Sequence, residues 1–176
     1  MNLFVTSEDP WQCARNLDDK RVGKMLMEAN QMMSLAVKIH WPDDDGSYVF
    51  YETSTELTSG WSHLNHPVSV WVRATRSNFL WTLQHGRALA AEFEHRFGHA
   101  HGSAARLQYL ETCEDCLPAG DVLPFQNSAR HDGLGLDFTY LPVPYSYREY
   151  LKHRWQTDKR AVTFTNRGAP AWSHLR

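Results

Sequence analysis

Residues with amine and carboxylate side chains recur at a regular spacing near the start of the chain. Lys20, Lys24, Glu28 and Gln31 are separated by four, four and three residues. In a helix, this spacing places the side chains in one row along the same side. A lysine amine beside a carboxylate can form a Schiff base with an aldehyde, or act as an acid or base, when burial lowers its pKa. The row predicts either a reactive face in a cleft or a solvated face with a surface Lys24–Glu28 ion pair.

The helix that would carry this row is predicted over residues 18–39. The stretch from Leu17 to His40 lacks proline, and its apolar residues fall on one broad stripe at helical spacing. Asp18 and Asp19 lie at the expected N-terminus, where negative charge is favourable. We therefore expect a long helix with one buried face and one polar face.

The rest of the chain predicts a mainly α fold: a single compact helical domain over residues 1–176, with one or two short strands at the N-terminus or an edge, and long loops. Leu3-Phe4-Val5 is a candidate strand. Residues 120–144 are rich in Gly, Pro, Asp and Asn and are predicted to form a long loop, which in a compact domain is often functional. Trp172 is expected to pack back on the body. Further helices are predicted over residues 10–16, 67–76, 77–97, 102–115 and 145–159.

Composition and charge narrow the class of protein. Of 176 residues, 42% are hydrophobic and 22% charged, which is typical of a globular chain. The absence of a long apolar run or a signal pattern, together with an odd number of cysteines, predicts a soluble cytosolic protein with no membrane partner. The net charge of −2 disfavours a strong nonspecific nucleic-acid binder, although the segment after Tyr145 is basic.

Histidines and cysteines in the second half of the chain raise the possibility of a zinc site. A zinc ion is commonly held by four such ligands, but their spacing here matches no standard zinc module. Motifs for metalloproteases, phosphate loops, dinucleotide binding and serine hydrolases are absent from the sequence. We expect no metal and no cofactor, with zinc as the alternative. The residues concerned are His95, His99, His101, Cys113 and Cys116.

The N-terminal pattern MNLFVTSEDPWQCARNLDDKRVGKMLMEANQMMSLA resembles that of small proteins encoded mainly by tailed bacteriophages. The resemblance covers most of the chain and implies action in the cytoplasm of a host cell. Later matching motifs are His66-Pro67 before Trp71-x-Arg73, Asn78 with Trp81, Pro124-Phe125-Gln126, Tyr147-Arg148-x-Tyr150 and a tryptophan near the end.

The segment from Asn2 to Val22 is also similar to the start of phage pyrimidine-dimer DNA glycosylases of the endonuclease V type. Ser7-Glu8 and Arg21-Val22 match pairs of that family. The resemblance implies a small, mostly helical enzyme that excises a base with an N-terminal amine as nucleophile, a helix glutamate and nearby arginines. Asn2 departs from the pattern, because it is too large for ready removal of Met1. The family's glutamate would be replaced by Glu28 or Asp19.

The leading hypothesis is a phage-type enzyme acting on DNA bases, namely an N-glycosylase with abasic-site lyase activity. Lys20 or Lys24 would be the nucleophile or an electrostatic stabiliser, and Glu28 or Asp19 the acid/base. An extruded base would be received by aromatic residues at Tyr48–Tyr51, Phe125 or Trp71. Candidates for substrate binding are Arg21, Gln31, His66, Arg73, Asn78 and Gln126, and candidates for phosphate contacts are Arg148, Lys152, Lys159 and Arg160.

Two alternatives remain open from the sequence. One is a transferase that modifies nucleotides or DNA bases in phage DNA modification, which fits the modest net charge. The other is a non-enzymatic protein that binds a host factor. The partner is therefore DNA or a nucleotide for a glycosylase or a transferase, and a host protein for a non-enzymatic binder. The sequence does not determine the oligomeric state.

Overall fold

The structure is a computed structural model that describes residues 1–40 and 63–175, so the prediction for Tyr48–Tyr51 lies outside the described residues. Within these ranges the chain is mainly α-helical, as predicted, and no helix in them is long and apolar enough to cross a membrane. The α-helices are α1 (Pro10–Arg15), α2 (Asp19–His40), α3 (Pro67–Ala74), α4 (Arg76–Phe97), α5 (Arg106–Thr112) and α6 (Val143–Thr157). Short 3₁₀ turns are η1 (Glu114–Cys116), η2 (Asp132–Leu134) and η3 (Ala171–Ser173), and the strands are β1 (Arg130–His131) and β2 (Leu136–Asp137).

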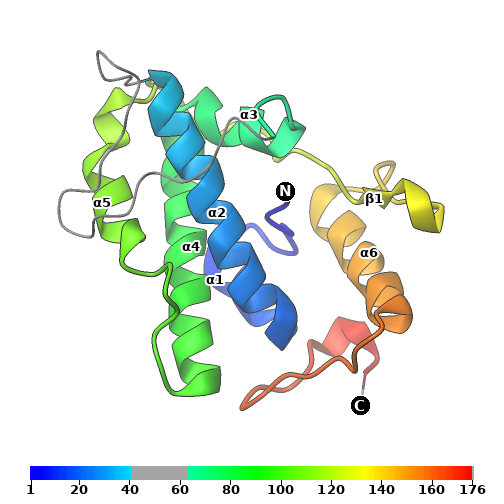
Figure 1. Cartoon of the computed structure of the whole chain (residues 1–176). Coiled ribbons are helices and arrows are strands. Elements are labelled where there is room, and N and C mark those ends of the chain that lie inside the picture. The colour runs from blue at the N-terminus through cyan, green and yellow to red at the C-terminus, as the bar shows by residue number, and fades with distance from the viewer. Residues whose placement is uncertain (41–62, 176) are drawn as a thin grey trace.

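Helix α2 is central to the fold. It packs against α3, α4 and α5 on one side, while α6 lies on the other side with the N-terminal segment between them (Figure 1). The predicted apolar stripe of α2 is buried throughout, which confirms the helical periodicity of the sequence. Its members are Val22, Met25, Leu26, Ala29, Met32, Met33 and Ala36. The opposite, polar face of α2 is thereby turned toward the N-terminal segment and α6.

Two predicted elements differ in the structure. Residues 3–5 form no strand, because the Asn2 Oδ1 atom accepts hydrogen bonds from the amides of Leu3 (2.8 Å) and Phe4 (3.0 Å) and bends the chain, with Phe4 at a φ of 47°. The helix expected over 102–115 is shorter, since a turn stabilised by the imidazole of His101 and the amide of Ser103 (3.1 Å) precedes α5. The two short strands lie instead within the predicted 120–144 loop.

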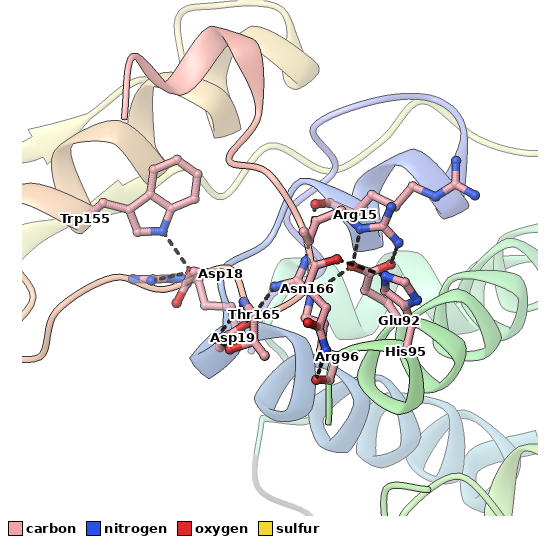
Figure 2. A network of polar contacts seen from close by, with 11 residues as sticks. Arg15, Asp18, Asp19, Glu92, His95, Arg96, Trp155, Thr165 and Asn166 are labelled. Atoms are coloured by element: carbon pink, nitrogen blue, oxygen red, sulfur yellow. Dashed lines mark hydrogen bonds and ion pairs between the residues drawn. The ribbon is translucent and has the colours of Figure 1, made fainter. Parts of the chain in front are cut away.

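The C-terminal tail is fixed to the starts and ends of helices by a polar network (Figure 2). The fully buried Arg96 side chain donates to Glu92 (2.8 Å) and Asp19 (3.0 Å), and Asp19 also accepts from the hydroxyl of Thr165 (2.7 Å). Burial acts to raise the pKa of Glu92, but hydrogen bonds from Arg167 and Arg96 outweigh it and lower that pKa below the ordinary value. The network therefore holds the tail beside α2 and α4 through ionised carboxylates.

Aromatic stacking also holds the tail. The ring of Trp172 stacks on that of Trp155 in α6, with centroids 5.5 Å apart. The docking that was predicted for this tryptophan is confirmed.

We expect the protein to lose stability in mild acid because of His85, which lies in the middle of α4. Its side chain is fully buried, which lowers its pKa from 6.5 to about 4, and its Nδ1 lies 3.1 Å from the carbonyl oxygen of Pro10. As the pH falls, His85 therefore takes up a proton near pH 6.5 in the unfolded chain but only near pH 4 in the folded chain, so acid favours unfolding. We expect this histidine to remove about 3 kcal/mol of unfolding free energy between pH 7 and pH 4.

Chemical denaturation of the wild type and of His85→Gln across this pH range measures the effect. The variant lacks the imidazole and is expected to show the shallower decline. Equal slopes for the two proteins would show that His85 titrates normally.

Candidate functional site

A cavity of about 320 Å³ lies between the polar face of α2, α6, the N-terminal segment and residues 128–131. The N-terminus lies between α2 and α6 (Figure 1). Five lining residues are lysines or arginines, and of the described lining residues Glu28 alone carries a carboxylate. The lining residues are Met1, Asn2, Phe4, Lys20, Arg21, Lys24, Met25, Glu28, His66, Ser128, Arg130, His131, Tyr150 and Arg154.

The Glu28 carboxylate lies between two amines. One oxygen, Oε2, accepts a hydrogen bond from the backbone amide of Asn2 (2.8 Å) and is 3.9 Å from the α-amine nitrogen of Met1. The other, Oε1, is 3.5 Å from the Nζ atom of Lys24. The side chain of Glu28 is only 11% exposed, whereas that of Lys24 is 56% exposed. The arrangement can pass a proton between a carboxylate and an adjacent amine at the cavity wall.

The N-terminal segment reaches Glu28 because local contacts fix its path. The Asn2 side chain bends the chain, as described above, and the ring of Phe4 packs edge-on against Tyr147 with centroids 5.9 Å apart. The Nε atom of Arg148 donates to the Thr6 carbonyl (3.0 Å). This predicted phosphate ligand thus connects α6 to the N-terminal segment.

Arg21 is a rigid part of the cavity wall. Its guanidinium donates to Asp18 (2.7 Å) and Asp158 (2.8 Å), and all three side chains are almost fully buried. Burial acts to raise the pKa of Asp158, but the charge and hydrogen bond of Arg21 outweigh it and lower that pKa. The nitrogen atoms of Lys20 (3.7 Å) and Arg154 (3.3 Å) also approach Asp158. A single buried carboxylate therefore orients three cations toward the cavity.

His66 lies at the cavity and also caps a helix. Its Nδ1 atom accepts from the amide of Val68 (3.2 Å) at the start of α3. Burial lowers the pKa of His66, as do the charges of the N-terminal amine and His63, against an opposing effect of Glu28. Because the shift is downward from 6.5, the ring is neutral at pH 7.

Other predicted site residues lie away from the cavity. Asp19 belongs to the tail network, and Arg73 donates to the Leu64 carbonyl (2.6 Å). The buried Asn78 side chain donates to the Trp71 carbonyl (2.7 Å). These side chains stabilise the connections of helices rather than line the cavity.

Three more predicted ligands do not line the cavity. Gln31 is half-buried in the helical turn after Glu28. Gln126 is exposed, and its carbonyl oxygen accepts from the Tyr147 hydroxyl (3.1 Å). Lys152 pairs with Glu149 at 2.7 Å.

The two remaining candidates for phosphate contacts, Lys159 and Arg160, are exposed after the end of α6. They line a second cavity of about 610 Å³. Three residues line both cavities, namely Lys20, His131 and Arg154, so the two hollows adjoin. A basic surface therefore runs from Glu28 along the C-terminal half of α6.

The predicted aromatic acceptors form a packed cluster instead of lining the cavity. The centroid of Trp71 lies 5.3 Å from that of Phe125 and 5.9 Å from that of Trp81. Trp71 is 6% exposed, and its indole nitrogen donates to the Leu123 carbonyl (3.2 Å). This cluster secures the loop after η1 against α3 and α4.

The possible zinc ligands are engaged separately. In the described residues, no three His, Cys, Asp or Glu side chains are grouped so that they could hold a metal ion. A His95 nitrogen lies 3.0 Å from the Asn166 carbonyl, His101 accepts from Ser103, and the thiol of Cys113 donates to the Tyr109 carbonyl (3.5 Å).

Several lining residues were not identified from the sequence. Ser128, Arg130 and His131 come from the loop that was predicted to be functional, but its composition does not mark them individually. Arg154 lies in the basic final helix without a motif around it. The position of the Met1 amine was implied only by the family resemblance, since it depends on a bend that Asn2 makes.

Comparison with known proteins gives one match. Residues 1–104, more than half of the chain, match the family described as pyrimidine dimer DNA glycosylase. No curated protein and no solved structure matches the chain. The matched region contributes α2, the N-terminal segment and His66 to the cavity, so it carries the Met1–Glu28–Lys24 arrangement. The chain belongs to the pyrimidine dimer DNA glycosylase family and is an enzyme of the DNA glycosylase type.

Proposed function

We propose that the protein is a DNA N-glycosylase with abasic-site lyase activity that removes a damaged pyrimidine. The observation that supports this most directly is the Met1 amine, 3.9 Å from the buried Glu28 carboxylate in a cationic cavity. Amines act as nucleophiles toward sugar carbons when a carboxylate or another base can take their proton. The family to which the chain belongs supports DNA as the substrate.

The proposed reaction uses one amine and one carboxylate. The Met1 amine, in its neutral form, attacks C1′ of the damaged nucleotide, the C1′–N bond breaks, and the base leaves with the electron pair and takes a proton from water, which leaves hydroxide. The amine passes a proton to Glu28, which donates it to the ring oxygen O4′ as the sugar opens to an iminium. Glu28 then accepts the C2′ proton, and the C3′–O bond breaks as its electron pair leaves with the 3′ phosphate. Water hydrolyses the iminium to an aldehyde and the free amine, and the hydroxide takes up the proton released in this step.

Lys20 and Lys24 are less suited to attack than the Met1 amine. Both side chains are more than half exposed, and each approaches a carboxylate, Asp158 or Glu28. Exposed ion-paired lysines serve better to orient a carboxylate or to attract DNA phosphates. We assign Lys24 the orientation of Glu28 and Lys20 a phosphate contact.

Cations around the two cavities would hold the DNA backbone. Arg130 is exposed at the first cavity, and Lys159 and Arg160 at the second. Phosphate contacts position a duplex without reading its sequence. Such contacts would bring a lesion to Glu28 even though the chain carries a net charge of −2.

Borohydride trapping tests the proposal. The wild type is incubated with duplex and single-stranded DNAs that carry pyrimidine dimers, abasic sites or modified thymines, and the product is reduced. We expect excision of the base and a covalent adduct whose peptide begins at Met1. Excision without an adduct would exclude the lyase step. Activity on free nucleotides alone would instead support the transferase alternative.

A further inference from the structure

A short hairpin beside the cavity exposes a leucine at its tip. Strands β1 and β2 pair antiparallel, with Arg130 opposite Asp137, and the turn η2 between them ends at Gly135, whose φ is 63°. Leu134, in this turn, is 43% exposed. The hairpin lies beyond the residues that match the family, so it is a feature of this chain that the match does not describe.

Leu134 borders the basic surface that leads to Glu28. It lines the second cavity together with Lys20, Arg154 and the cations that follow α6. Its hairpin neighbour His131 lines both cavities. Of the carboxylates nearby, Asp132 pairs with Arg130 (3.4 Å) and Asp158 with three cations, while Asp137 accepts hydrogen bonds from the amide and hydroxyl of Thr139. An apolar side chain therefore protrudes beside a surface suited to phosphates.

The two residues that flank Leu134 add no side chain to the turn. They are Gly133, where a Cβ atom would meet Cε1 of His131 at 3.4 Å, and Gly135, where a Cβ atom would have no neighbour within 4 Å. A nucleotide taken out of a duplex leaves a gap in the stack, and unstacking costs a few kcal/mol. Apolar wedges such as leucine are used by DNA-binding proteins to separate base steps and kink the duplex.

On the basis of the proposed glycosylase function, we propose that Leu134 enters the duplex at the lesion and fills the space left by the nucleotide that occupies the Glu28 cavity. The hairpin supplies the wedge, and the cations of the second cavity hold the adjoining backbone. The preferred substrate is accordingly double-stranded DNA, because a single strand offers no stack to open.

The direct test measures base unstacking without catalysis. Glu28→Gln, with and without Leu134→Ala, is titrated into a duplex that carries 2-aminopurine beside a tetrahydrofuran abasic analogue. We expect a fluorescence increase with Leu134 and a loss of at least half of it with Leu134→Ala. Tyr140→Ala is the matched control, since Tyr140 is 77% exposed and lines neither cavity. Equal increases in all three proteins, or no binding to the duplex, would overturn the proposal.

Activity provides a second readout that separates this proposal from the function on which it rests. With Glu28 intact, Leu134→Ala is expected to lower kcat/KM on duplex DNA by about tenfold and to leave single-stranded DNA unaffected. Equal losses on both substrates, or none, would refute the wedge while leaving the glycosylase assignment in place. A wild type that excises no base from any DNA would refute both.

Discussion

Glu28→Gln is expected to lower kcat for base excision by about 10²–10⁴-fold, the usual contribution of a general acid or base. The amide oxygen can still accept the hydrogen bond that the Asn2 amide now donates to Oε2 at 2.8 Å. The position of the N-terminal segment is therefore preserved, and the melting temperature should change little. What the variant loses is a group that takes a proton from the Met1 amine, 3.9 Å away, and from C2′.

Glu149→Gln is the matched control for this prediction. Glu149 also lies on a helix and pairs with a lysine, Lys152, at 2.7 Å, but it does not line the cavity. Single-turnover excision and thermal denaturation of both variants separate catalysis from folding. Retained excision in Glu28→Gln, or a large melting decrease with excision in proportion to the folded fraction, would contradict the catalytic role.

The sequence predicted the elements whose stability is local. The apolar stripe of α2 specifies a long helix with one buried face, whereas its polar row was compatible with either a cleft or a solvated face. Lys20, Lys24 and Glu28 do line the cavity, whereas Gln31 does not. Helical spacing predicts that these residues lie on the same side of α2. How far the cavity extends along that side depends on which segments pack against it, and these segments cannot be read from the spacing. The division of the chain into domains and its resemblance to phage proteins stay predictions.

The partners of each polar residue were less predictable, because they come from distant parts of the chain. Asp19 resembles a catalytic candidate in sequence, yet its carboxylate binds Thr165 and Arg96. Asn78 bonds the Trp71 carbonyl, and its Oδ1 accepts from the Leu123 amide (2.9 Å). A polar side chain at a helix start serves capping and docking as readily as catalysis. Only the folded arrangement distinguishes these uses.

The contact between the N-terminal amine and Glu28 also could not be predicted from residue spacing. No spacing in the sequence connects Met1 with Glu28, since they meet through the bend at Asn2 and the packing of Phe4 on α6. The family resemblance implied an amine at this position, but Asn2 departs from the family's small residue. The structure provides an amine beside the glutamate with Met1 in place.

Two residues added before Met1 are expected to abolish the borohydride-trapped adduct. The extension converts the α-amine into a peptide nitrogen, which cannot form an iminium, and moves the new terminus away from Glu28. Lys24 and Lys20 remain in place, so any adduct formed through a lysine would survive. The measurement is the yield of adduct on abasic-site DNA, with circular dichroism to confirm that the extended chain folds.

Lys24→Arg and Lys20→Arg are the matched variants, because arginine keeps the positive charge but does not act as an amine nucleophile. We expect both to form the adduct, with peptide mapping by mass spectrometry placing it on Met1. Loss of the adduct in Lys24→Arg and its survival in the extended chain would instead assign the nucleophile to Lys24, whose Nζ atom lies 3.5 Å from Glu28. The same carboxylate would then serve a different amine, because Glu28 lies within reach of both.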